Sequence, residues 1–228
     1  MRIIAGKYRS RILKSLKGLA LRPTSDRLRE TLFNILGPAV AGSHFLDVFA
    51  GTGAVGIEAL SRGAAHVTFL ENHAPAAKLI RQNLDSLKIT TGYTILAADA
   101  LTALQKLANR RSPGVGALAP TLPSGKKGAS APEELGLSPT RGDAIPSDKS
   151  HASFDFVFVD PPYAAHVDYA RTLEFLATAK FLAPAALIIF EHHHKFQLPE
   201  SAGQLTRTRL LKQGDATLSF FRFSRDDQ

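Results

Sequence analysis

Asp47-Val48-Phe49-Ala50-Gly51-Thr52-Gly53-Ala54-Val55-Gly56 is the stretch that decides the fold, because it joins a short apolar run to a helical pattern through a glycine-rich turn. Its glycines fit the spacing G-x-G-x-x-G. Glycine allows a tight turn and a close approach of the backbone to a ligand. In open α/β sheets such a turn lies at the carboxyl ends of parallel strands, where ligands bind. The stretch therefore predicts a cofactor-binding turn, and its spacing alone does not identify the cofactor.

Strands and helices are expected to alternate on both sides of this turn. A helix over 25–36 comes first, followed by strands at 45–49, 67–71, 93–98, 154–160 and 185–191, with helices at 54–62, 74–88, 100–110 and 168–180 between them. The segments 205–211 and 217–223 flank Gln213-Gly214-Asp215 as a hairpin. Alternation of this kind predicts parallel βαβ units with helices on both faces of the sheet. The expected fold class is α/β, with a mostly parallel seven-stranded sheet and an antiparallel edge hairpin.

Three acidic residues come at or just after the ends of successive predicted strands, namely Asp47, Glu71 and Asp99. Asp47 would repel the pyrophosphate of a dinucleotide, whereas it suits the ammonium and sulfonium groups of S-adenosylmethionine. Glu71 is positioned to accept the two ribose hydroxyls. Asp99 could accept the adenine amine, or simply cap the following helix. The residues expected to bind the cofactor are Asp47, Ala50, Gly51, Thr52, Gly53, Glu71, Asn72, Asp99 and Ala100.

A second motif, Asp160-Pro161-Pro162-Tyr163, follows the apolar strand that ends in Val159. The two prolines restrict the backbone and remove two N–H donors, which leaves carbonyl oxygens and a carboxylate as acceptors. Acceptors grouped in this way can hold the N–H bonds of an exocyclic amine, and Tyr163 can stack on a planar ring. A tight turn at the end of a strand is the alternative interpretation. The acid before the prolines and the aromatic residue after them favour a site, so Asp160, Pro161, Pro162 and Tyr163 are the candidate catalytic residues.

Positive charge is concentrated at the N-terminus. The first 30 residues hold nine Lys or Arg and two acids, whereas the other 198 hold 19 basic and 18 acidic residues. Such a basic arm predicts a polyanionic partner, most simply nucleic acid, although a solvated tail is the alternative. We expect residues 1–24 to form an RNA-contacting extension of a domain at 25–228, and the candidate RNA-binding residues are Arg2, Lys7, Arg9, Arg11, Lys14, Arg22 and Arg27.

Residues 109–152 break the alternating pattern. This segment of 44 residues holds six Pro, six Gly, six Ser and no aromatic residue. Such a composition buries too little apolar surface to offset the entropy of ordering the chain. We expect a disordered insertion within the domain, which is more consistent with a passive role than with a second RNA contact.

The composition excludes several classes of function. The chain has no Cys, which rules out disulfides, thiolate metal sites and cysteine nucleophiles, including the thiolate adduct of 5-methylcytosine formation. His192-His193-His194 lies in an expected strand, where successive side chains point to opposite faces, so no metal site is expected. No apolar run is long enough to span a bilayer, and the N-terminus lacks the apolar segment of a signal peptide. We expect a cytoplasmic protein with no membrane partner.

Two stretches resemble a known family. Asp160-Pro161-Pro162-Tyr163 resembles the motif of amino-group methyltransferases with the class I, Rossmann-like fold. The segments 1–9 (MRIIAGKYR) and 22–34 (RPTSDRLRETLFN) resemble the bacterial RsmD-type 16S rRNA guanine-N2 methyltransferases. This resemblance covers nearly the whole chain apart from 109–152, which is longer than the family leads one to expect. It implies S-adenosylmethionine as methyl donor, a guanine of 16S rRNA as target and a ribosomal particle as substrate, and we expect a monomer.

The chemistry of the target suggests what the motif does. The lone pair of guanine N2 is delocalised into the ring, so the amine must be oriented towards the methyl group. Asp160 and the Pro161 carbonyl can hold its N–H bonds and stabilise the positive charge that develops. Asp160 is also a candidate proton acceptor, although the proton can leave after methyl transfer.

Three other functions remain open at this point. A DNA adenine-N6 methyltransferase shares the Asp-Pro-Pro-Tyr motif, but it usually carries a target-recognition domain that 109–152 cannot form. A protein glutamine methyltransferase would have Asn-Pro-Pro-Tyr and no basic arm. A non-catalytic rRNA-binding assembly factor would need none of the acids at the strand ends.

Overall fold

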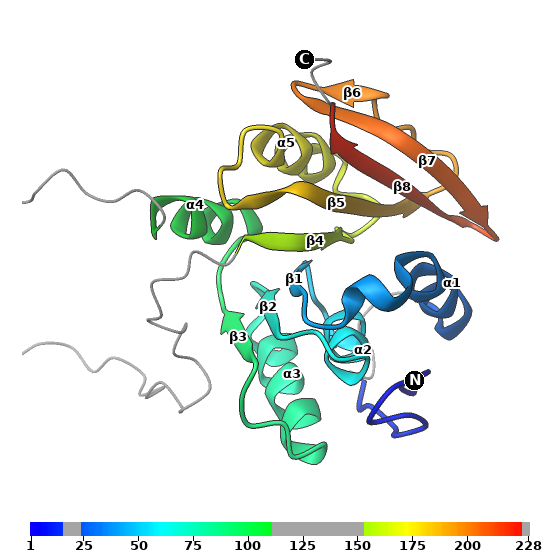
Figure 1. Cartoon of the computed structure of the whole chain (residues 1–228), viewed down its shortest axis with the longest axis vertical. Coiled ribbons are helices and arrows are strands. Elements are labelled where there is room, and N and C mark those ends of the chain that lie inside the picture. Colours follow the sequence, from blue (N-terminus) through cyan, green and yellow to red (C-terminus); the bar gives the residue numbers. More distant parts are fainter. Residues whose placement is uncertain (16–23, 111–152, 225–228) are drawn as a thin grey trace, which may run out of the picture.

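The computed structural model describes residues 1–15, 24–110 and 153–224, which form one eight-stranded sheet with helices on both faces (Figure 1). The strand order is β3-β2-β1-β4-β5-β8-β7-β6. The parallel strands are β1 (His44–Val48), β2 (His66–Leu70), β3 (Tyr93–Leu96), β4 (Phe154–Val159) and β5 (Leu182–His193), and the antiparallel ones are β6 (Ser201–Ala202), β7 (Leu205–Gln213) and β8 (Ala216–Phe223). The predicted α/β class with an antiparallel edge is confirmed.

Five α-helices lie among the described residues, and they divide between the faces of the sheet. They are α1 (Asp26–Leu36), α2 (Ala54–Ser61), α3 (Ala74–Ser86), α4 (Ala100–Arg110) and α5 (His166–Leu176), and a short 3₁₀ helix, η1, covers Gly37–Val40. Apolar residues of α1, α2 and α3 share one buried cluster, and those of α4 and α5 share the other. Both sheet faces are therefore covered, as a mostly parallel sheet requires. No helix in the described part of the chain is long and apolar enough to cross a membrane.

Two features of the sheet differ from the prediction. The sheet has eight strands rather than seven, because β6 pairs with β7 through only two residues and is too short to leave a sequence pattern. β5 begins at Leu182 rather than at residue 185, although Pro184 lies near its start. The register between β4 and β5 shifts in this region, between Phe154 and Phe156 on β4. This irregularity accommodates a proline that a regular ladder would exclude.

The boundaries of two helices also differ from the prediction. α5 spans His166–Leu176, earlier at both ends than the expected 168–180. α4 continues through Arg110, so the expected insertion cannot begin at residue 109. Residues 111–152 lie outside the described residues, and the disorder expected for them stays a prediction.

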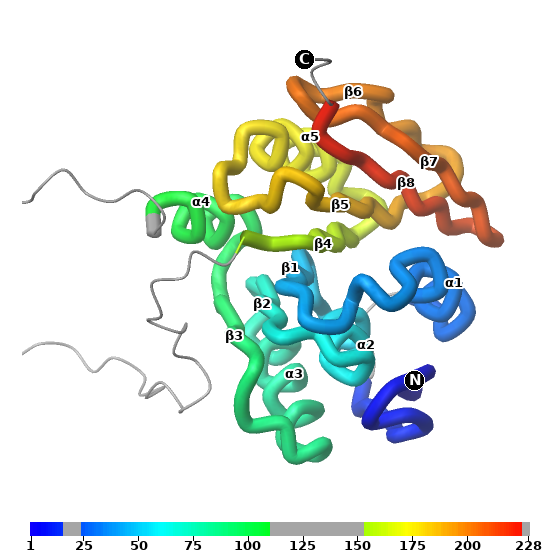
Figure 2. The backbone as a smooth tube through the Cα atoms, in the orientation of Figure 1, coloured from blue at the N-terminus to red at the C-terminus, as the bar shows by residue number. Residues whose placement is uncertain are grey.

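The N-terminal residues 1–15 pack against the body of the protein beside α2 and α3 (Figure 2). Ile3 and Leu13 are buried in the same apolar cluster as α1 and α2. The backbone N–H groups of Ile4 and Ala5 donate to the Glu58 carboxylate at 2.7 and 3.0 Å. Gly6 approaches the end of α2 so closely that an added Cβ would lie 1.9 Å from the Ser61 carbonyl oxygen. The backbone of this segment is thus anchored, which leaves its charged side chains to project outward.

Candidate functional site

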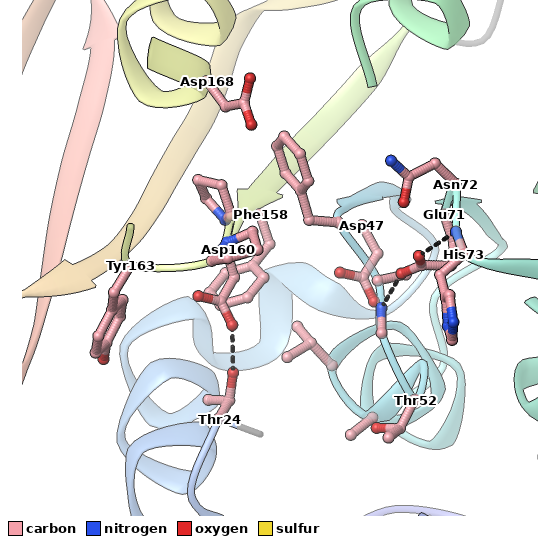
Figure 3. A pocket seen from close by; sticks show the side chains of 17 residues that line it. Thr24, Asp47, Thr52, Glu71, Asn72, His73, Phe158, Asp160, Tyr163 and Asp168 are labelled. Atoms are coloured by element: carbon pink, nitrogen blue, oxygen red, sulfur yellow. Dashed lines mark hydrogen bonds between the residues drawn. The ribbon is translucent and has the colours of Figure 1, made fainter. Parts of the chain in front are cut away.

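A cavity of about 430 Å³ opens where β1, β2 and β4 end, at their carboxyl edge (Figure 3). Ten of the residues expected in the site line it: Asp47, Ala50, Gly51, Thr52, Glu71, Asn72, Asp160, Pro161, Pro162 and Tyr163. Sequence reasoning missed seven others, namely Thr24, Phe49, Ala54, Val55, His73, Phe158 and Asp168. Gly53, Asp99 and Ala100 were expected and are not among the lining residues. The two motifs therefore share one cavity although more than 100 residues separate them.

The glycine-rich turn is held by Asp47 at the end of β1. Gly51 and Gly53 have φ angles of 55° and 75°, in the left-handed region that favours glycine. The buried Asp47 carboxylate accepts a hydrogen bond of 2.8 Å from the backbone N–H of Gly56, in the first turn of α2. Gly56 itself has no room for a side chain, since an added Cβ would lie 2.3 Å from the Phe69 ring. The third glycine of the motif thus allows α2 to pack closely on β2.

Glu71, just beyond β2, is hydrogen-bonded to the opposite side of the same turn. Its Oε2 accepts a hydrogen bond of 2.7 Å from the N–H of Gly51, and its Oε1 accepts one of 2.8 Å from the N–H of His73 (Figure 3). Each carboxylate oxygen has further lone pairs, so two hydroxyl donors can still be accepted. Burial and the nearby Glu71 charge raise the pKa of Asp47 to about 7, although the Gly56 hydrogen bond opposes the rise. This wall of the cavity thus carries two carboxyl groups, which suit a cationic ligand.

Asp160, at the end of β4, lies beside a second buried acid. Thr24 contacts both, with its Oγ1 3.4 Å from Oδ2 of Asp160 and 2.7 Å from Oε2 of Glu191. Burial raises the pKa of Asp160 well above its ordinary range, and the charges of Glu191 and Asp47 raise it further. Glu191 lies on β5, and Thr24 directly precedes Ser25, the residue that caps α1. Neither was expected in the site.

The two prolines are fixed by the start of α5. The hydroxyl of the buried Tyr169 donates to the Pro161 carbonyl at 3.1 Å, and the N–H of Ala165 donates to the Pro162 carbonyl at 2.7 Å. A carbonyl oxygen has two lone pairs, so that of Pro161 can accept one more donor. The Tyr163 ring meets the His193 ring edge-on, with centroids 5.5 Å apart. The Asp-Pro-Pro-Tyr turn is thus supported by contacts on the side of α5 and β5.

Asp99 has the contact of a helix cap. Its Oδ2 accepts a hydrogen bond of 3.3 Å from the N–H of Thr102, in the first turn of α4, and its side chain is exposed. This is the alternative that the sequence left open for Asp99. The expectation that Asp99 and Ala100 bind the cofactor gains no support from the cavity.

The consecutive histidines His192 and His193 contact different residues rather than one common point. His192 is buried and its Nε2 lies 2.8 Å from the Ser219 hydroxyl, whereas His193 contacts Tyr163. Within residues 1–15, 24–110 and 153–224, no three His, Cys, Asp or Glu side chains gather as a metal site would require.

The basic side chains of the arm divide into two groups. Arg2, Lys7, Arg9, Arg11, Lys14 and Arg27 are exposed, and Arg22 lies outside the described residues. Arg29, which contributed to the excess of positive charge, is completely buried. Its guanidinium lies 2.9 Å from Asp26 and 3.8 Å from the buried Glu58. Arg29 is therefore unavailable to a polyanion, and the sequence-based charge of the arm overstates what the surface presents.

Comparison with known proteins connects this geometry to a family. The family model described as "Conserved hypothetical protein 95" matches residues 1–114 and 137–222. The chain belongs to this family. Ribosomal RNA small subunit methyltransferase D of Haemophilus influenzae is one relative, 34% identical over 193 residues. The match covers 84% of this chain and 78% of the relative. YlbH of Bacillus subtilis is 31% identical over 209 residues, covering 92% and 91%.

A solved structure agrees with this assignment. The Escherichia coli protein yhhF superimposes with a TM-score of 0.68 at 29% identity, over 98% of each chain. The match of the family model extends on both sides of the glycine-rich turn and includes the Asp-Pro-Pro-Tyr segment. The resemblance to RsmD-type proteins expected from the sequence is confirmed.

Proposed function

We propose that this protein transfers a methyl group from S-adenosylmethionine to the exocyclic N2 amine of a guanine in 16S rRNA. The substrate is the small ribosomal subunit or its precursor, and the protein acts in the cytoplasm as a monomer. One observation carries the proposal: the Asp160–Tyr163 motif shares a single cavity with the glycine-rich turn and Glu71. The relatives named Ribosomal RNA small subunit methyltransferase D support rRNA as the substrate class.

The acidic side of the cavity fits the methyl donor. S-adenosylmethionine supplies an electrophilic methyl group on a positively charged sulfur. Asp47 and Glu71 would hold its cationic groups and ribose hydroxyls, and Gly51 allows the backbone to approach closely. Asn72 and Thr52 line the same side and complete the contact set. Gly53, Asp99 and Ala100 are left out of it, because they do not line the cavity.

The Asp160 side of the cavity fits an amine on a planar base. Asp160 and the remaining lone pair of the Pro161 carbonyl would accept the two N–H bonds of guanine N2 and hold the nitrogen in line with the methyl group. The negative charge nearby would stabilise the positive nitrogen as the bond forms. Tyr163 would stack on the ring, a contact worth about 1–3 kcal/mol per base. The base has to leave its helical stack first, which costs a few kcal/mol.

Contacts between the arm and the rRNA phosphates would offset the free-energy cost of unstacking the base. Arg2, Lys7, Arg9, Arg11 and Lys14 are exposed on a segment whose main chain is bonded to α2 and α3. An anchored row of cations can neutralise phosphates without ordering a flexible tail at the same time.

The proposal is tested by mapping methylated nucleotides. Small subunits from cells lacking the protein are incubated with it and labelled S-adenosylmethionine, and the 16S rRNA is digested and analysed by mass. We expect one N2-methylguanine to appear. Label in adenine of added duplex DNA, with none in rRNA, would instead support the DNA adenine-N6 alternative, and label in neither would overturn the methyltransferase assignment.

The matched variant is Asp160→Ala. It should abolish transfer while leaving the calorimetric affinity for S-adenosylhomocysteine nearly unchanged, because Asp160 faces the target side of the cavity. Full activity in this variant would remove Asp160 from the reaction.

A further inference from the structure

A single hydroxyl contacts two buried acids beside the reacting centre. Thr24 Oγ1 lies 2.7 Å from Oε2 of Glu191 and 3.4 Å from Oδ2 of Asp160. Thr24 and Asp160 line the cavity, whereas Glu191 is absent from its lining and only 4% exposed. In Figure 3 the Thr24 side chain points towards the Asp160 carboxylate from the side of α1. Glu191 therefore reaches Asp160 through Thr24.

The hydroxyl has one hydrogen to share between these two acids. The shorter distance identifies Glu191 as the acceptor of that hydrogen. An ionised Asp160, at 3.4 Å, receives only the weaker share of that hydrogen. When Asp160 carries a proton, it can instead donate to a lone pair of Thr24 Oγ1, while the hydrogen of Thr24 stays with Glu191.

We propose that Glu191 is a positioning residue that acts through Thr24 to make Asp160 the proton acceptor of the methylation. This inference rests on the proposed function. Glu191 holds the Thr24 hydroxyl in the one orientation that can accept a hydrogen bond from protonated Asp160. The negative charge of Glu191 also disfavours a negative charge on Asp160 and so favours its protonated form.

The proton balance is simple. As N2 bonds the methyl carbon, the carbon–sulfur bond breaks and its electron pair goes to sulfur, so N2 becomes positively charged and carries two hydrogens. One of these leaves as a proton to Asp160 Oδ2, which restores a neutral amine. Asp160 then donates to Thr24 Oγ1, while Thr24 keeps its own hydrogen bonded to Glu191. After the reaction, both hydrogen bonds, from Asp160 to Thr24 and from Thr24 to Glu191, are therefore made without a further proton transfer.

Titratable groups approach this link from several elements. Asp47 comes from β1, Glu191 from β5, Tyr169 from α5 and Tyr163 from the turn after β4. The Tyr169 hydroxyl donates to the backbone carbonyls of Pro161 and Glu191, which fixes the turn and β5 relative to each other. The burial of Asp160 and the nearby negative charges raise its pKa, in the direction of the proposed role, whereas the contact with the Thr24 hydroxyl lowers this pKa to a smaller extent. Of these charges, that of Glu191 is the larger contributor.

The first test measures Asp160 directly, without catalysis. Full-length protein is labelled with ¹³C at aspartate carboxyls, and the Asp160 resonance is the one missing from Asp160→Asn. In Glu191→Gln the side chain keeps an acceptor oxygen for Thr24 and loses its charge. We expect the apparent titration midpoint of Asp160 to fall by about one pH unit in this variant.

The matched control is Asp155→Asn, at the opposite end of β4. Its carboxylate accepts a hydrogen bond of 2.8 Å from the N–H of His44 and does not line the cavity. This variant should leave the Asp160 midpoint within about 0.2 pH units of wild type, because distant charges are screened. Equal midpoints in wild type and Glu191→Gln would overturn the inference.

The second test concerns the hydroxyl and is independent of how Glu191 variants fold. Thr24→Val keeps the shape and removes the hydroxyl, and it should lower the rate of methyl transfer at least about tenfold. Thr24→Ser keeps the hydroxyl and should stay within about threefold of wild type. A wild-type rate in Thr24→Val would refute the role of Thr24. Absence of methyl transfer in the wild-type protein would refute the proposed function instead. The carboxyl titration does not depend on catalysis, so the two failures can be told apart.

Discussion

At the scale of single residues, Asp47 has two opposing effects. Its pKa of about 7 lies above the ordinary value of 3.8, so the folded state favours the protonated form. The stability that this group contributes is complete below about pH 4 and is lost as the pH rises towards 7. Above pH 7 the ionised carboxylate opposes folding, and it is this ionised form that attracts a cationic ligand.

Asp47→Asn should therefore stabilise the ligand-free protein at pH 8. The amide keeps an oxygen acceptor for the Gly56 N–H and removes the buried charge. We expect a gain of about 1–3 kcal/mol at pH 8 and much less at pH 4.5, with each kcal/mol raising the Tm by about 2–4 °C. The same substitution should weaken the binding of S-adenosylmethionine. Thermal unfolding at both pH values checks the prediction, and a gain of equal size at pH 4.5 and pH 8 would contradict it.

Glu71→Ala should weaken cofactor binding by about 1.5–3 kcal/mol, the range for hydrogen bonds to a charged group. The loss has two sources, since Glu71 is both a proposed ribose ligand and the acceptor for the N–H groups of Gly51 and His73. Calorimetry with S-adenosylhomocysteine measures the effect. Glu71→Gln is the control, because it keeps one acceptor oxygen and should lose less affinity. An unchanged dissociation constant in Glu71→Ala would remove the residue from the site.

Local sequence could identify only part of the cavity. Asp47, Glu71 and Asp160 could be predicted because each stands at or next to the end of an apolar strand, where parallel strands meet at one edge. Thr24 and Glu191 could not, because their contact joins positions 167 residues apart. Asp168 was likewise hidden, since an acid in the first turn of a helix is a common capping preference. Contacts between distant segments leave no local pattern.

At the scale of elements, Arg29 joins three separate parts of the chain. Its guanidinium donates to Asp26 within α1 and to the backbone carbonyls of Arg2 and Thr24, and it pairs with Glu58 on α2. Both Arg29 and Glu58 are completely buried. Removing one partner of a buried ion pair leaves the other charge without compensation.

Arg29→Ala should lower the free energy of unfolding by about 3–5 kcal/mol. The matched control is Arg27→Ala, two residues earlier in the same helix, whose side chain is exposed and whose loss should matter by about 0.5 kcal/mol or less. Urea unfolding of the two variants provides the comparison. Similar small losses in both would mean that the Arg62–Glu58 pair alone compensates the buried charge.

The elements themselves were largely predictable, because hydrophobic periodicity and glycine stops act locally. Helix α1 begins at Asp26, one residue after the expected start, because Ser25 caps it with a hydroxyl that accepts from the Leu28 N–H. The extension of β5 past Pro184 was not predictable, because it depends on an irregular register with β4. The pair β6–β7 was missed for a similar reason, since two residues form a strand only when a partner strand is present.

At the scale of the whole molecule, the arm combines a fixed backbone with free charges. Lys14 is bonded through its N–H to the Asn83 side chain at 2.8 Å, and Tyr8 through its N–H to Ser61 at 3.0 Å. Ile3 and Leu13 are buried, so the backbone of the arm packs on the body of the protein. The count of basic residues could not reveal that Arg29 is buried, because burial of an arginine depends on the distant Glu58.

The last prediction concerns the salt dependence of RNA binding. If the exposed arm side chains contact phosphates, each contact contributes about −0.7 to −0.9 to the slope of log affinity against log salt. Replacing Arg9, Arg11 and Lys14 together by neutral residues should then flatten the slope by about 2–3 units, with little change in cofactor affinity. The control replaces Lys106, Arg171 and Lys180, three exposed cations on or next to α4 and α5, whose apolar residues pack in the other buried cluster. It changes the net charge equally and should leave the slope close to wild type. Binding of 16S rRNA across a salt series, with cofactor titration in parallel, measures both, and equal slopes in the two triple variants would mean that net charge, rather than the arm, governs the encounter with RNA.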